Sequence, residues 1–283
     1  MDAFRQQQLA FRRLEIYLAF NSFKQLIQDG YRGSNHGLQA IDGGSINWSS
    51  WSSDGNSKTV ECDKDVLLAG HSFGGATVAS EACLNGVQGL TLAEQFTILS
   101  TDPPADVCAP IPVHKALILD PWLEPIPSPG PCPPPRGQDD ALPQLLVINS
   151  EKFSLWKDHF ARLIGVVQAW EPEKRRVITI REFSLHSLAI MQEFICAAVR
   201  SQHTSFSDFA HLPLFARRDS HILMNRIVEL SEVFIDGDVD AFMSEHATRK
   251  MEIRVVGKKS DGSPQRQIIG DVGDIIAHCS TEL

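Results

Sequence analysis

The feature that most constrains this chain is the pentapeptide Gly70-His71-Ser72-Phe73-Gly74 and its setting. An apolar run, residues 66–69, precedes it, and a run of small residues, 75–79, follows it. This order predicts a buried strand, a sharp turn and a helix, which is the setting of a G-x-S-x-G nucleophile elbow. The flanking glycines let the backbone turn tightly, so that the Ser72 hydroxyl stands above the end of a sheet. The pentapeptide alone is a weak signal, and the apolar run before it makes the prediction strong.

Three further apolar runs favour an α/β sheet. The four predicted strands cover residues 65–69, 116–119, 145–148 and 177–180. None of them alternates with polar residues, which is typical of parallel strands covered on both faces. Helical patterns occupy residues 3–29, about 73–86, 153–169 and about 220–235. We therefore predict a mostly parallel sheet with helices on both faces.

Length and composition limit the number of domains and the kind of partner. With 283 residues, of which 43% are hydrophobic, the chain suits one large α/β domain. We assign that domain to residues 1–250 and, because the sequence beyond becomes polar, expect a weakly ordered tail over 251–283. The net charge of −9 argues against a nucleic-acid partner and against strong attraction to anionic membranes.

The cysteine pattern and the first residues predict a cytoplasmic protein. The six cysteines lie far apart without a C-x-x-C pair, so we expect reduced thiols. The amino-terminal stretch lacks the apolar core of a secretion signal. The ten histidines show no metal-binding spacing, and no apolar run is long enough to span a bilayer.

Residues that could activate a serine follow the elbow in a suitable order. A serine hydroxyl needs a histidine to accept its proton and a carboxylate to orient that histidine. Asp120 directly follows the strand 116–119, although an ordinary turn aspartate before proline would look the same. His203 and His186 both follow the last predicted strand. His71 is excluded as the base because the neighbours of an elbow serine point away from its hydroxyl.

Four segments in order carry a family resemblance. They are LLAGHSFGGAT, ALILDPWLEPIP, LLVINSEKF and HTSFSDF. Together they resemble the platelet-activating-factor acetylhydrolases, group VII-type phospholipases A2 on an α/β-hydrolase fold, and are most similar to the intracellular fungal members. The resemblance covers about residues 60–235. As an ordered set, the four segments are far more specific than any one alone.

The resemblance implies a reaction and a role for each matching residue. It implies Ser72 as nucleophile, Asp120 as acid and His203 as base in hydrolysis of the sn-2 ester of a glycerophospholipid, through an acyl-enzyme. It implies the backbone N–H of Phe73 as an oxyanion donor and Trp122 beside the acyl pocket. No metal, including calcium, and no other cofactor is implied. His203 matches the family segment better, whereas His186 lies closer to the last strand, so His186 stays a rival base.

Two departures from the family pattern keep alternatives open. Only about 64 residues precede the elbow strand, and we expect the amino-terminal strands of the fold, with the second oxyanion donor, to be missing. Residues 182–200 form an apolar insertion before the His203 segment, interpreted as a lid or an error of the gene model. The alternatives are a general carboxylesterase or lipase, and a catalytically silent hydrolase-like protein. Weak contact with a membrane surface, by Trp48 and Trp51, is a further hypothesis.

Overall fold

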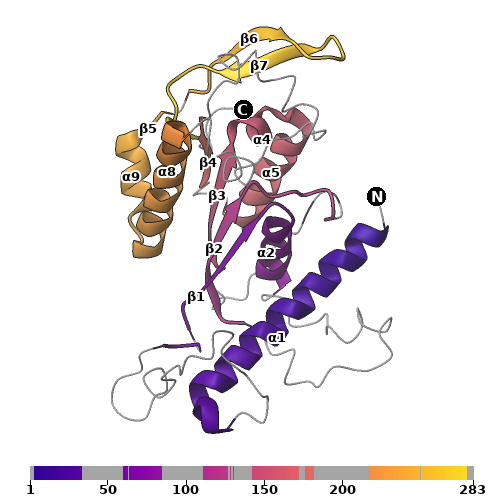
Figure 1. The fold of residues 1–283 in the computed structure, drawn as a ribbon, viewed down its shortest axis with the longest axis vertical. Helices are drawn as coiled ribbons and strands as arrows, with labels where there is room; N and C mark the ends of the chain where they lie inside the picture. Colours follow the sequence, from indigo (N-terminus) through magenta and orange to yellow (C-terminus); the bar gives the residue numbers. More distant parts are fainter. Residues whose placement is uncertain are drawn as a thin grey trace.

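The computed structural model describes most of the chain as one sheet with helices on its two faces (Figure 1). The described residues are 3–33, 60–62, 64–84, 111–126, 128, 130, 142–171, 176–181, 217–248 and 250–278. In chain order the elements are α1 (Ala3–Gly33), β1 (Val66–His71), α2 (Phe73–Leu84), β2 (Val113–Leu119), β3 (Gln144–Ser150), α4 (Glu151–Leu155), α5 (Lys157–Trp170), β4 (Val177–Ile180), α8 (Arg217–Asp236), α9 (Val239–His246), β5 (Ala247–Thr248), β6 (Ile253–Lys258), β7 (Pro264–Ile268) and β8 (Ile275–Ala277).

The predicted parallel strands are confirmed. The main sheet has the order β1-β2-β3-β4-β8-β5, and the first four strands pair parallel to their neighbours. Their carboxyl ends therefore meet at one edge, which we call the rim. Helix α2 follows β1 and helices α4 and α5 follow β3, because parallel neighbours need a crossover connection. Among the described strands, β1 pairs only with β2 and so lies at an edge.

Two cores cover the two faces of the sheet. On one face α1, α2 and α5 pack over alternate residues of β2 and β3, with Ile118 and Val147 fully enclosed. On the other face α8 and α9 pack over the intervening residues, among them Leu146 and Ile148. Because both sets of side chains are buried, these strands carry no polar alternation. The prediction of helices on both faces is confirmed.

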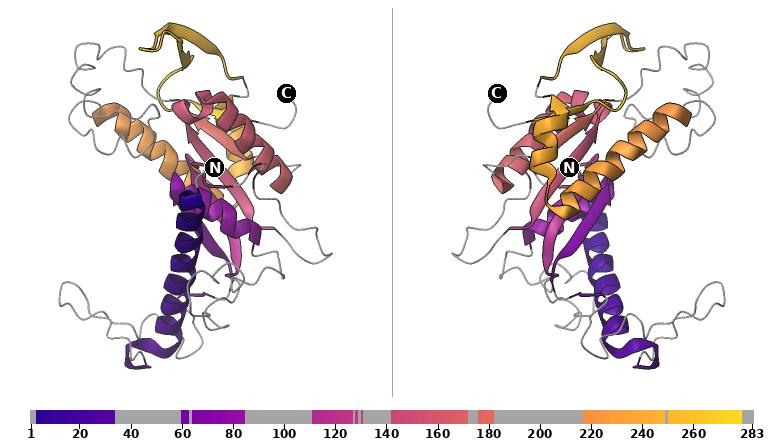
Figure 2. Two further views of the ribbon diagram at one scale, coloured as in Figure 1. Left: turned by 90° about the vertical axis from the view of Figure 1, so that its right-hand side faces the viewer. Right: turned by 90° about the vertical axis from the view of Figure 1, so that its left-hand side faces the viewer.

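Helix α1 runs along one side of the sheet and extends past it (Figure 2). It continues to Gly33, beyond Gly30, where the sequence had predicted its end. Tyr17 packs with Ile111 near the starts of β1 and β2, and Leu9 joins the core above α2. Helix α1 is therefore packed against the rest of the described chain through Tyr17, near its middle, and through Leu9, closer to its amino terminus. None of the described helices has the length and apolar character needed to cross a bilayer.

The expectation of a weakly ordered tail is wrong for residues 251–278. Strands β6 and β7 form an antiparallel hairpin, and β8 enters the main sheet antiparallel to β4. The hairpin lies beyond the α4 end of the sheet (Figure 1). We call residues 250–278 the C-terminal unit. Its order comes from long-range pairing and from burial of Ile268, Ile275 and Ile276, which local polarity does not reveal.

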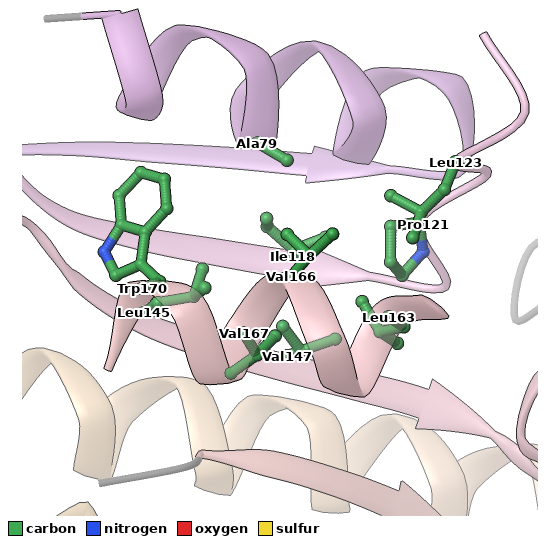
Figure 3. A pocket seen from close by; sticks show the side chains of 10 residues that line it. All are labelled: Ala79, Ile118, Pro121, Leu123, Leu145, Val147, Leu163, Val166, Val167 and Trp170. Carbon is green, nitrogen blue, oxygen red and sulfur yellow. The ribbon is translucent and has the colours of Figure 1, made fainter. Parts of the chain in front are cut away.

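A small apolar cavity lies between α2, the sheet and α5 (Figure 3). Trp170 closes one end, with its Nε1 donating a hydrogen bond of 2.9 Å to the Pro143 carbonyl. Pro121 and Leu123, from the segment after β2, line it as well. Because its described lining is apolar, it offers no partner to water and is a gap in core packing.

Candidate active site

The strand–turn–helix junction predicted at Ser72 is confirmed. Ser72 stands alone between the end of β1 and the start of α2, with φ of 55°. A non-glycine residue in this left-handed region is strained, by about 1–3 kcal/mol, and persists only where the surroundings enforce it. Its backbone N–H donates to the Leu119 carbonyl at 2.9 Å, and its carbonyl accepts from the Trp122 N–H at 3.0 Å. The turn is thus fastened to the segment that leaves β2.

Of the two glycines named in the motif, only Gly70 is required by close packing. A Cβ added at Gly70 would lie 2.3 Å from the carbonyl oxygen of Gly74. A Cβ at Gly74 would meet nothing within 4 Å. The second close approach is at Gly75, where a Cβ would lie 2.9 Å from Ile118 Cγ2. The elbow therefore depends on Gly70 and Gly75, where α2 crosses back over β1 and β2.

Asp120 occupies the matching position on the next strand. It is fully buried directly after β2, with φ of 42°. Its N–H donates to the Ile148 carbonyl at 3.0 Å, and its Oδ1 accepts from the Ser150 N–H at 2.6 Å. The carboxylate is therefore held at the rim by the end of β3. Ser72 and Asp120 lie at the carboxyl ends of adjacent strands, as the sequence predicted.

The remaining predicted site residues divide into two groups. Phe73 is the first residue of α2, so its N–H has no acceptor within the helix. Trp122 is half-buried, with its ring 6.2 Å from that of Phe73. His203, His186 and the apolar insertion 182–200 lie outside the described residues, as do Trp48 and Trp51.

A buried chain of polar groups, missed by the sequence analysis, runs from the rim to the C-terminal unit. The Ser154 hydroxyl donates to the Ser150 carbonyl at 3.2 Å and contacts Thr179 Oγ1 at 2.6 Å. Thr179 Oγ1 in turn lies 2.7 Å from His278 Nε2. Since Ser154 gives its only proton to Ser150, Thr179 must donate to Ser154, and His278 to Thr179. Neutral His278 therefore carries its proton on Nε2.

Burial sets the charge of His278. It lowers the pKa of the imidazole to about 4, because the ring is removed from water. The ring packs edge-on against Phe160 at 4.8 Å between centroids. Among the described histidines, His278 is thus a neutral hydrogen-bond donor to β4. In the sequence, the local feature that could have indicated this burial is the short apolar run 275–277 directly before His278.

Two buried charged residues tie the hairpin to the rim. Glu151, at the start of α4, accepts a hydrogen bond of 2.7 Å from the Ile268 N–H. Arg181, just after β4, donates from Nε to the Ile268 carbonyl at 3.3 Å. Their exposed fractions are 3% and 7%. We call this arrangement, with Glu151 and Arg181 on the two sides of Ile268, the Ile268 clamp.

The end of β3 also holds unsatisfied polar groups. Asn149 and Ser150 are fully buried, and within the described chain neither the Asn149 amide nor the Ser150 hydroxyl has a hydrogen-bond partner. Buried polar groups without partners are uncommon and often mark functional regions. The described residues contain no group of three or more His, Cys, Asp or Glu side chains placed to hold a metal ion.

The parallel sheet, the helices on both faces and the strained serine between β1 and α2 define an α/β-hydrolase-like fold. The chain belongs to the family of platelet-activating factor acetylhydrolase, isoform II, whose sequence model matches residues 2–212. The chain is therefore a hydrolase of the esterase or phospholipase type. No curated protein and no solved structure matches it significantly. The matched region ends before α8, so α8, α9 and the C-terminal unit lie outside it.

Proposed function

We propose that this chain hydrolyses the acetyl or short-chain sn-2 ester of platelet-activating factor and related glycerophospholipids. The observation that carries the proposal is the pairing of the strained Ser72 turn with buried Asp120 on the adjacent strand, in a chain of this family. In the proposed triad Ser72 is the nucleophile, Asp120 the acid and His203 the base, with His186 as the rival for the last role. The substrate is the only partner the proposal needs.

The reaction proceeds in two halves. His203 accepts the hydroxyl proton as Ser72 Oγ attacks the ester carbonyl carbon, and the Phe73 N–H donates to the resulting oxyanion. The bond to the glycerol oxygen then breaks, and His203 returns the proton to that leaving oxygen. Water, deprotonated by the same histidine, next attacks the acyl-serine. The bond from the acyl carbon to Ser72 Oγ then breaks, the histidine returns the proton to Oγ, and the fatty acid is released. One oxyanion donor contributes about 3 kcal/mol to barrier lowering.

A fluorophosphonate probe tests the nucleophile. We expect covalent labelling of the folded protein at Ser72, and loss of both labelling and ester hydrolysis in Ser72→Ala, by at least about 10³-fold. Ser231→Ala is the matched control, because Ser231 lies on α8 with its hydroxyl bonded to the Ile227 carbonyl. A folded wild-type protein that is not labelled would instead be the catalytically silent alternative.

Two comparisons then separate the remaining alternatives. Labelling lost in His203→Ala but kept in His186→Ala assigns the base to His203, and the reverse result transfers that role to His186. Preference for short over long sn-2 chains in phospholipids supports the acetylhydrolase proposal. Equal or better hydrolysis of simple carboxylic esters and long-chain lipids supports a general carboxylesterase or lipase.

A further inference from the structure

A cation lies one aromatic ring away from the Ser72 turn. The Arg5 guanidinium carbon is 5.2 Å from the centroid of the Trp122 ring, which in turn is 6.2 Å from the ring of Phe73. Trp122 is also fastened to the turn through its N–H bond to the Ser72 carbonyl. The amino-terminal end of α1 thus brings a positive charge to the rim, although Arg5 is far from Ser72 in sequence.

Among the residues that the structure describes, no carboxylate forms an ion pair with Arg5. Within the described chain, the Arg5 side chain donates a hydrogen bond of 2.7 Å from Nη1 to Oε1 of the neutral Gln8 side chain. Arg12, seven residues further along the same helix, is instead paired with Glu15 at 2.6 Å. The two arginines share one helix and differ in whether a carboxylate neutralises them. Arg5 is also half-buried, which strengthens its attraction for an incoming anion.

We propose that Arg5, stacked on Trp122, is a binding subsite for the phosphate of the phospholipid substrate. The inference rests on the proposed function and extends it from the ester to the rest of the substrate. In a glycerophospholipid the phosphodiester is attached to the glycerol carbon next to the one that bears the sn-2 ester, so both groups meet the protein close together. A guanidinium offers paired N–H donors matched to phosphate oxygens, and the indole fixes its plane beforehand.

The test compares two substrates across three arginine variants. One substrate is a soluble phospholipid with an sn-2 acetyl ester, and the other is neutral p-nitrophenyl acetate. We expect Arg5→Ala to lower the ratio of their kcat/KM values about tenfold, mainly through KM for the phospholipid. Arg5→Lys, which keeps the charge and loses the planar fork, restores part of the ratio. Arg12→Ala leaves the ratio at its wild-type value, because Arg12 already faces Glu15.

The experiment distinguishes failure of the proposed phosphate subsite from failure of the proposed function. If Ser72→Ala retains hydrolysis of both esters, the proposed function fails, whatever Arg5 does. If Ser72 is required but Arg5→Ala lowers kcat/KM equally for both substrates, or for neither, the proposed phosphate subsite is wrong. An Arg5→Lys variant as poor as Arg5→Ala also overturns it, because charge then contributes nothing. Thermal unfolding of each variant identifies any loss caused by misfolding, and Arg5→Lys then supplies the decisive measurement.

Discussion

The Ser72 turn and the C-terminal unit are both fixed at the rim, but by different kinds of interaction. The turn is held by hydrogen bonds between backbones and by a glycine that lets two backbones touch. The C-terminal unit is held by the buried side chains of Glu151 and Arg181 and by the pairing of β8 with β4. The first region lies inside the family match and the second outside it. The Ser72 turn therefore relies on contacts between backbones, whereas the additional unit relies on two buried charged side chains as well as on strand pairing.

The largest effect is expected where two backbones touch. Gly70→Ala places a methyl group against the Gly74 carbonyl, so the turn must open. We expect loss of at least about 10²-fold in ester hydrolysis and about 3 kcal/mol in the free energy of unfolding. Activity assays and urea unfolding measure these losses. A fully active Gly70→Ala variant would contradict this account of the turn.

Gly74→Ala is the matched control for that prediction. Its Cβ meets open space, and its φ is not positive, so alanine fits the helix. Alanine in place of glycine in a helix is worth about 0.5–1 kcal/mol. We expect unchanged or slightly raised stability, although both glycines belong to the same motif.

The Ile268 clamp gives the next largest effect. Glu151→Ala leaves the buried Ile268 N–H without this acceptor and should lower the free energy of unfolding by about 2 kcal/mol. Glu151→Gln keeps an acceptor oxygen and should lose less. Urea unfolding measures both, and amide exchange of Ile268 reports the local loosening. Equal stability of the alanine and glutamine variants would show that the hydrogen bond is not what holds the hairpin.

The smallest expected effect on stability near neutral pH comes from the protonation of His278. Its pKa of about 4 in the folded state lies below the usual 6.5, so the unfolded chain binds a proton first as pH falls. The contribution of His278 to the free energy of unfolding is therefore fully present above about pH 6.5, and it decreases by about 3 kcal/mol as pH approaches 4. His278→Gln should flatten that part of the pH profile of the urea midpoint. An unchanged slope between pH 7 and pH 5 would remove His278 from the explanation.

The sequence predicted the central sheet because burial on both faces requires uninterrupted apolar runs. The four parallel strands, the Ser72 turn and the position of Asp120 follow from such local signals. The predicted helix over 153–169 instead begins at Glu151 and divides at Trp156 into α4 and α5. Helical periodicity continues across Trp156, so the sequence pattern did not predict the division.

The C-terminal unit was missed because its strands lack that signal. Strand β6 is largely exposed and β8 has only three residues. One local signal was present, since Asp261-Gly262 forms the turn of the hairpin, with Gly262 at φ of 82°. Glu151 and Arg181 resemble ordinary polar strand ends in sequence. Their burial results from residues about a hundred positions away, which no local pattern encodes.

The pairing of β4 with β8 has a consequence for biosynthesis. These neighbours are separated by α8, α9 and the hairpin, so the ribosome must release almost all of the described chain before β4 gains its second partner. Until then the open ladder of β4 can pair with other nascent chains. Translation arrested before residue 275 should therefore yield an aggregating product, and chaperone demand should end once β8 emerges.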